Sequence, residues 1–207
     1  MKNAVVFLAD GFEEIEGITV IDYLRRAGVQ VFTVTVPSST TKQKNISVGS
    51  HNISVITDLS FEQFETKFLK DLPDLVYIPG GIPGAPNNAK CEGVLNFVKK
   101  MFDSGKIVSS ICASPAVVLA KTEILKGRKW TCYPEMENNL AEYCGSEENA
   151  KICTENSVHI KDVPFVSDKN LLTGRGPGTT EQFAMEAVRL LCGEDVALKV
   201  KTASVQR

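Results

Sequence analysis

Several kinds of residue and motif are scarce in this chain of 207 residues, and each absence excludes a class of function. The 23 lysines and arginines do not outnumber the 25 acidic residues, so the chain lacks the basic excess of proteins that bind nucleic acid or anionic membranes. No apolar run approaches the roughly 18 residues of a membrane-spanning helix. The apolar stretch at residues 4–9 is too short for a secretory signal. We therefore expect a cytoplasmic protein without a nucleic-acid or membrane partner.

Metal ligands and cofactor motifs are also scarce. The sequence holds only two histidines, His51 and His159, and none of its six cysteines belongs to a C-x-x-C pair. Zinc sites and disulfide frameworks normally show such spacings, so the pattern predicts free thiols and no metal ion. No G-x-G-x-x-G segment follows the first predicted strand, and the glycine-rich segment 173–180 lacks the Lys-Ser/Thr ending of a phosphate-binding loop. The sequence therefore predicts no cofactor.

The remaining composition is that of a globular domain. Hydrophobic residues make up 43% of the chain and charged residues 23%, and no repeat or low-complexity linker divides it, so we expect one domain over residues 1–207. Short apolar runs predict strands at 4–8, 29–36, 75–78 and 107–111. The segments 46–48 and 52–56 predict a hairpin, and 165–173 holds two short strand-like runs. Amphipathic segments predict helices at 13–27, 61–69, 91–104 and 180–191, and the region between 112 and 180 is less regular, with a strand at 130–132 and a helix at 134–143. Alternating strands and helices predict an α/β fold whose mostly parallel central sheet carries helices on both faces.

The stretch from Ile107 to Pro115 is the strongest candidate for chemistry. It predicts a buried strand ending at Ile111 and a helix opened by Pro115, so Cys112 lies on a strand-to-helix turn. Free N–H groups and the positive end of the helix dipole favour a thiolate there. Serines two residues before and two residues after Cys112 suit a sharp turn beneath an exposed nucleophile. The alternative is a buried structural cysteine at the end of a strand.

Two more loops are expected beside this turn, because ligands of parallel α/β folds bind beyond the carboxyl ends of the strands. In the first loop, Glu16 shares a helical stripe with Val20 and Tyr23, which predicts partial burial and a raised pKa. A solvated carboxylate in the first helical turn is the alternative. In the second loop, the N–H groups around Gly81 are unhindered and would form an oxyanion hole with that of Ala113, unless the glycines serve only a tight turn.

Neither histidine offers a base close to Cys112 in the sequence. We interpret His51 as a solvated residue of a hairpin turn, and His159 as a surface residue in a short polar run. A cysteine peptidase needs an imidazole to activate its thiol and to protonate the leaving amine. A carboxylate and backbone donors instead favour proton transfer on a small carbonyl substrate.

Four motifs resemble those of a known family when they are taken together. They are LADGFEEIE at 8–16, PGG at 79–81, ICASP at 111–115 and RGPGT at 175–179. In this order, and over nearly the whole chain, they resemble the ThiJ/PfpI superfamily, and within it the branch of the parkinsonism-associated protein deglycases and their bacterial relatives. The resemblance implies a flavodoxin-like α/β sandwich and a homodimer.

The resemblance also implies a role for particular residues. Cys112 would be the reactive, oxidation-sensitive cysteine, and Glu16 the carboxylic acid hydrogen-bonded to it. The N–H groups of Gly81 and Ala113 would line the pocket. The rest of the pocket wall would consist of His51, Ile82, Tyr133 and Pro177.

Two residues depart from the family pattern. Tyr133 stands where human-type members carry a histidine, and His51 stands where many relatives carry an arginine. The first departure removes the expected imidazole near the thiol, so that Glu16 would do the proton work alone. The peptidase branch has a histidine directly after its cysteine, and Ala113 argues against membership of that branch.

The sequence therefore supports two functions. The first is a cofactor-free glyoxalase or deglycase, in which Cys112 attacks a dicarbonyl such as methylglyoxal, or its adducts, and Glu16 moves a proton through an enediol. The second is a redox sensor or chaperone, in which a protonated Glu16 stabilises a sulfinate on Cys112. A role for Cys132 as a resolving thiol stays open.

Overall fold

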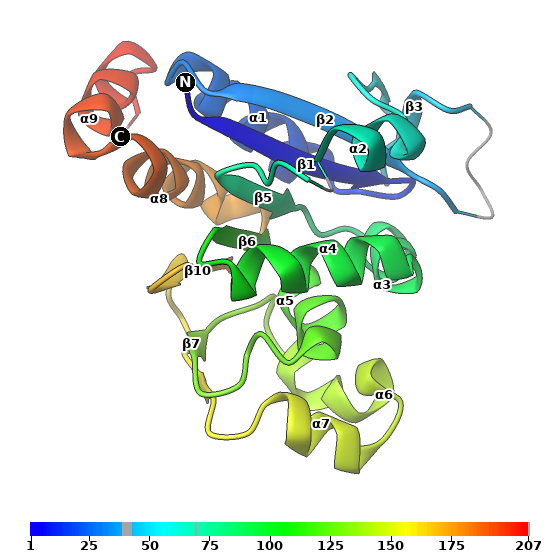
Figure 1. Ribbon diagram of the computed structural model, residues 1–207. Helices are drawn as coiled ribbons and strands as arrows, with labels where there is room; N and C mark the ends of the chain where they lie inside the picture. The colour runs from blue at the N-terminus through cyan, green and yellow to red at the C-terminus, as the bar shows by residue number, and fades with distance from the viewer. Residues whose placement is uncertain (39–42, 69, 207) are drawn as a thin grey trace.

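A six-stranded sheet forms the centre of the structure, which is a computed structural model that describes residues 1–38, 43–68 and 70–206 (Figure 1). In spatial order its strands are β2 (Gln30–Val36), β1 (Asn3–Ala9), β5 (Leu75–Ile78), β6 (Ile107–Ile111), β10 (Leu171–Gly174) and β9 (Phe165–Asp168). The first five pair in parallel, and β9 is an antiparallel strand at the edge. This is the mostly parallel α/β sheet that the sequence predicts.

Helices cover both faces of the sheet, because alternate side chains of a strand point to opposite faces. The ring of Phe7 in β1 packs edge-on against Phe64 and Phe97, on α2 (Phe61–Phe68) and α4 (Glu92–Asp103). The next residue, Leu8, lies against Gly17 of α1 (Glu14–Arg26) on the opposite face. On that face α1 packs beside α8 (Thr180–Cys192), which in turn contacts α9 (Glu194–Ala203). On the first face α3 (Gly84–Lys90) packs against α4.

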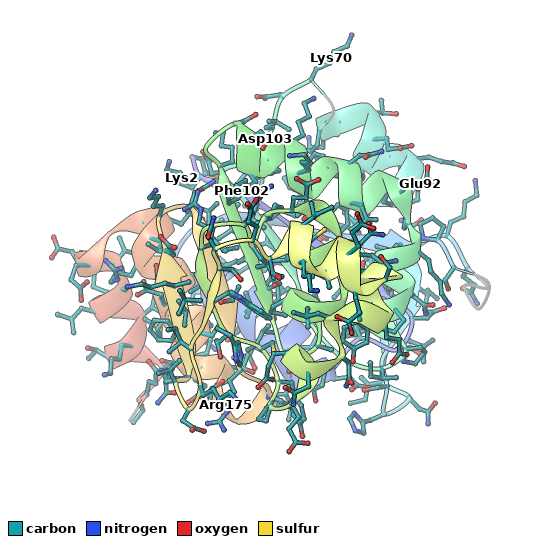
Figure 2. All side chains as sticks on the ribbon, turned by 90° about the horizontal axis from the view of Figure 1, so that it is seen from below. Lys2, Lys70, Glu92, Phe102, Asp103 and Arg175 are labelled. Atoms are coloured by element: carbon teal, nitrogen blue, oxygen red, sulfur yellow. The ribbon has the colours of Figure 1, made fainter. Side chains whose placement is uncertain are left out.

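The carboxyl ends of the parallel strands lie at one end of the sheet. Figure 2 shows Lys2, just before β1, in the upper half of the molecule and Arg175, just after β10, at its lower edge. The chain enters the sheet at β1, adds β2 on one side of it and then continues with β5 on the other. In such sheets, the crevice beyond the strand ends at this reversal is where ligands bind.

Between β6 and β10 the structure departs from the sequence prediction. The predicted strand at 130–132 is β7 (Lys129–Trp130), which pairs with the unpredicted β8 (Val158–His159). Glu135 has a left-handed φ of 71°, so the predicted helix 134–143 is instead the short 3-10 helix η2 (Met136–Asn139) followed by α6 (Leu140–Cys144). The helices α3, α7 (Glu147–Cys153) and α9 are also unpredicted.

A short hairpin, β3 (Ile46–Val48) and β4 (Ser54–Ile56), stands beside the carboxyl end of β1, as predicted. It is anchored there because the N–H of Gly11 donates to the carbonyl of Val48. The last residue of the helix predicted at 61–69 lies outside the described residues. Within the described ranges, no helix has both the length and the apolar character needed to span a bilayer.

Candidate functional site

The turn after β6 has the predicted strand-turn-helix form. Between the end of β6 at Ile111 and the start of α5 (Ser114–Val117), Cys112 adopts a left-handed φ of 62°. A residue with a side chain rarely adopts this conformation unless its surroundings impose it. Here the Cys112 N–H donates to Gly174 at 2.9 Å, and its carbonyl accepts the N–H of Tyr133 at 2.8 Å. The fold therefore holds the cysteine in this position from both sides.

Glu16 lies in the first turn of α1 and is fully buried, with 0% of its surface exposed. The N-cap residue Glu13 fixes this turn, because its carboxylate accepts the N–H of Glu16 at 2.8 Å. One Glu16 oxygen, Oε2, accepts the N–H of Gly80 at 2.7 Å. The other oxygen, Oε1, is buried and accepts no hydrogen bond from the residues that the structure describes. The alternative of a solvated carboxylate is therefore wrong.

Gly80 is the point at which the three predicted loops meet. A Cβ built on Gly80 would lie 2.6 Å from the Cβ of Cys112 and 2.9 Å from Oε2 of Glu16. It would also lie 3.1 Å from the backbone nitrogen of Ala113. Only a residue without a side chain fits between these groups, so the cysteine and the carboxyl meet across Gly80.

Burial dominates the ionisation of both groups. It raises the pKa of Glu16 from 4.5 to about 8, although the hydrogen bond from Gly80 acts in the opposite direction. It also raises the pKa of Cys112, and the negative charge of Glu16 raises it further. The expectation that the helix end yields a ready thiolate is therefore wrong while Glu16 is ionised. The pair carries one negative charge far more easily than two, so a thiolate on Cys112 requires a proton on Glu16.

Backbone donors surround the sulfur. The N–H groups of Gly81 and Ala113 interact with it and lower the pKa of Cys112 against the effect of burial. Cys112 remains 9% exposed, so the sulfur is not sealed from water. The structure thus brings together Glu16, Gly81, Cys112 and Ala113.

The four residues predicted for the pocket wall lie in different surroundings. Tyr133 is half exposed, its N–H binds the Cys112 carbonyl, and its ring lies over Gly176, next to Pro177. Ile82 follows Gly81 and is largely exposed. His51 lies on the turn between β3 and β4.

The sequence did not predict the partner that holds His51. Buried Glu14 accepts the His51 N–H at 2.6 Å and pairs with its ring Nδ1 at 2.7 Å, which raises the pKa of His51. The exposed ring agrees with the predicted turn residue. Glu14 lies in the first turn of α1, and its carboxylate ties the hairpin to the start of this helix.

The prediction for His159 is wrong, because its side chain is largely buried. In the β7–β8 pair His159 stands opposite Trp130, and the two rings lie 4.8 Å apart. Its Nε2 lies 3.7 Å from the sulfur of Cys132. The cysteine with an imidazole neighbour is therefore Cys132 and not Cys112. Strands of two residues show no periodicity, so the sequence carried no signal for this contact.

Known proteins resemble this chain over most of its length. The profile of the DJ-1/PfpI family matches residues 2–190. Protein DJ-1 homolog B of Arabidopsis thaliana is 32% identical over 97% of the chain, and protein dj-1beta of Drosophila melanogaster is 31% identical over 96%. A protein named deglycase from Pyrococcus abyssi is 29% identical to this chain, and the match covers 91% of this chain and 99% of that protein.

The shared length differs between these relatives. The chain spans 40% of the Arabidopsis homologue, which is less than half, but 94% of the Drosophila protein. The crystal structure of Drosophila DJ-1beta superposes with a TM-score of 0.83 at 30% identity, and the match covers 99% of this chain and 97% of that one. The oxidised form of Toxoplasma gondii DJ-1 superposes with a TM-score of 0.81 at 25% identity and covers 99% and 98% of the two chains.

Proposed function

The chain belongs to the DJ-1/PfpI family, and on that premise we propose that it is a cofactor-free enzyme that acts on dicarbonyls such as methylglyoxal or on their adducts with proteins. The observation that carries this proposal is the buried Glu16 carboxyl, which meets Cys112 across Gly80 and has one oxygen without a hydrogen bond. The relative from Pyrococcus abyssi that is named a deglycase supports the same class of reaction.

The first step joins the substrate to the sulfur. The Cys112 thiol gives its proton to water while Glu16 keeps its own, and the resulting thiolate attacks the aldehyde carbon. The C–S bond forms and the carbonyl electron pair moves to the oxygen. The N–H groups of Gly81 and Ala113 stabilise the charge that develops there. The proton held by Glu16 then neutralises this oxygen, which leaves a hemithioacetal and an ionised Glu16.

The second step moves a proton between neighbouring carbons. Ionised Glu16 removes the hydrogen from the hemithioacetal carbon and returns it to the adjacent carbon through an enediol, so that a thioester remains. Water hydrolyses the thioester to lactate and restores the thiol. A pKa of about 8 suits this work, because Glu16 then holds and releases a proton close to neutral pH. Tyr133 in place of a histidine leaves this task to Glu16.

Lactate formation from methylglyoxal tests this mechanism. We expect Cys112→Ser and Glu16→Gln each to lower the turnover number by about 100-fold or more. Cys91→Ser serves as the matched control, because Cys91 is a half-buried thiol at the start of α4, and it should keep wild-type turnover. Undiminished lactate production by either site variant would remove the mechanism.

A redox role is the second candidate, and the solved oxidised form of Toxoplasma gondii DJ-1 favours it. Peroxide would oxidise the Cys112 thiolate in two steps, each adding one oxygen and releasing one water, and a protonated Glu16 would donate to the sulfinate. Mass spectrometry after mild peroxide treatment should then find two oxygens on Cys112 and fewer on the other thiols. A disulfide from Cys112 to Cys132 would instead show Cys132 to be a resolving thiol.

We also propose that the chain forms a homodimer through a face that carries four exposed isoleucines. Ile18 of α1 and Ile56 of β4 line one groove on the surface, together with charged side chains of α1 and Asp58. Ile15 of α1 and Ile53, just before β4, are more than half exposed. Patches of this kind on a small domain commonly mark a contact with another chain. A two-fold axis would pair the face with itself. A cytoplasmic location stays a prediction from the sequence.

A further inference from the structure

A second cluster of chemically active side chains lies apart from the Cys112 sulfur, and three separate segments supply it. Cys132 follows β7, Glu137 belongs to η2, and His159 ends β8. One ligand atom from each lies within 4.8 Å of those of the other two. The Cys132 sulfur is 3.7 Å from Nε2 of His159, and Nδ1 of His159 is 3.7 Å from Oε1 of Glu137.

Two polar atoms of this cluster are buried and unpaired. Among the residues that the structure describes, neither Nδ1 of His159 nor Oε2 of Glu137 has a hydrogen-bond partner. Buried polar atoms normally have one, and of these two atoms Oε2 of Glu137 is the one that a ligand held beside Cys132 and Nε2 of His159 would satisfy. The three side chains line a pocket of about 100 Å³. A water molecule occupies about 30 Å³ of liquid, so the pocket has room for an ion and one or two waters.

We propose that Cys132, Glu137 and His159 bind a divalent cation of the zinc class. A thiolate, an imidazole and a carboxylate are the ligands that zinc takes, whereas magnesium and calcium require oxygen ligands. Typical Zn–S and Zn–N bonds at a tetrahedral angle place the sulfur and the nitrogen about 3.6 Å apart. The 3.7 Å between the Cys132 sulfur and Nε2 of His159 matches this spacing. Three protein ligands leave the fourth position for water.

Cation binding releases a proton from the cluster. An ion of the zinc class takes a cysteine as the thiolate and a histidine as the neutral imidazole. Binding of one ion therefore forms the sulfur–metal bond, breaks the S–H bond of Cys132 and releases one proton to water.

Lys161 is the group that competes with the cation. Its ammonium lies 3.1 Å from Oε1 of Glu137 and partly neutralises the carboxylate. The Lys161 side chain is 68% exposed, so it can turn into the solvent when an ion takes its place. Removing this positive charge should therefore strengthen metal binding.

The same distances also fit a thiol–imidazole–carboxylate arrangement of the hydrolase type, in which the histidine would activate Cys132. Exposure decides between the two. Cys132 is 2% exposed and faces a pocket too small for a peptide or an amide substrate, whereas an ion and its water fit. The bound ion would tie the segment after β7 to β8. That segment includes Tyr133, whose N–H donates to the Cys112 carbonyl. Arg175, which follows β10, also lines the pocket, so the pocket lies at the carboxyl end of the sheet (Figure 2).

Titration of the chelator-treated full chain with Co²⁺ tests the proposal without reference to any activity. We expect one equivalent to bind, with a thiolate-to-cobalt absorption in the near ultraviolet and the visible bands of a tetrahedral ion, and Zn²⁺ to displace it. Cys132→Ala and His159→Ala should lose the absorption and bind at least about 100-fold more weakly. Lys161→Met, which changes no ligand, should bind about two- to fivefold more tightly.

Two controls separate this cluster from the other thiols. Cys112→Ala removes the sulfur of the first site, and Cys144→Ser removes one of two thiols, Cys144 and Cys153, that contact each other. Both variants should bind Co²⁺ like the wild type. Absence of the thiolate absorption from the wild type at one equivalent, or its persistence in Cys132→Ala, would overturn the proposal. If His159→Ala fails to fold, the Cys132→Ala and Lys161→Met results decide.

Discussion

Replacement of Gly80 by alanine is the sharpest steric perturbation of the proposed site. The added Cβ would lie 2.6 Å from the Cβ of Cys112, which is closer than real Cβ contacts come, and 2.9 Å from Oε2 of Glu16. The first neighbour is fixed by the backbone of the turn, and the second is fully buried, so neither moves without displacing the loop that carries it. The cysteine and the carboxyl must therefore separate.

The expected cost has two parts. Overpacking of a buried site lowers the free energy of unfolding by about 1–3 kcal/mol. A displacement of catalytic groups by about 1 Å lowers turnover by about 100-fold. Urea denaturation followed by circular dichroism measures the first effect, and lactate formation from methylglyoxal measures the second, under conditions in which the variant is folded.

Gly178→Ala is the matched control, because Gly178 is exposed and a Cβ there meets nothing within 4 Å. It should keep wild-type turnover and change the free energy of unfolding by no more than about 0.5 kcal/mol. Wild-type stability and turnover in Gly80→Ala would refute the reasoning, because the two groups would then not be held against each other at Gly80.

Three further predictions concern charge and association. Because the pKa of Glu16 rises from 4.5 to about 8 on folding, the folded state binds more protons than the unfolded state between these pH values. The free energy of unfolding should therefore fall by up to about 5 kcal/mol as the pH rises from 4.5 to 8. Denaturation of Glu16→Gln should show no such fall. Ile56 is 81% exposed, so Ile56→Asp should leave the fold intact but convert the proposed dimer to a monomer in light scattering, whereas Ile152→Asp on α7 should keep the oligomeric state of the wild type; a monomeric wild type would contradict the proposal. Glu14→Gln removes the anion that pairs with His51, so an NMR titration should show a lower pKa for His51 than in the wild type; an unchanged value would contradict the pairing.

The sequence predicted those parts of the site that depend on local patterns. A β-branched run followed by a small-residue turn and a proline predicted the strand-turn-helix at Cys112, and the structure has it. The alternation of strands and helices predicted the parallel sheet, and such sheets collect their loops at one end. The approach of Glu16 to Cys112 came from the family resemblance, since no spacing in the sequence relates two residues so far apart.

Contacts between distant segments were beyond the sequence. The helical stripe predicts partial burial of Glu16, but its hydrogen bond from Gly80 depends on the fold, which brings Gly80 to it from the end of another strand. The pairing of Glu14 with His51 depends on how the hairpin folds over the start of α1. His159 is largely buried because β8 pairs with β7. Each of these strands has only two residues, so neither has a hydrophobic periodicity from which the contact could be predicted.

An NMR titration of the Glu16 carboxyl carbon tests the central claim most directly. The signal is assigned by its absence from Glu16→Gln and followed with pH in the folded protein. A carboxyl that shares a buried site with the Cys112 thiol should titrate near pH 8. A midpoint close to the ordinary 4.5 would show that Glu16 is ionised at neutral pH and holds no proton for the reaction.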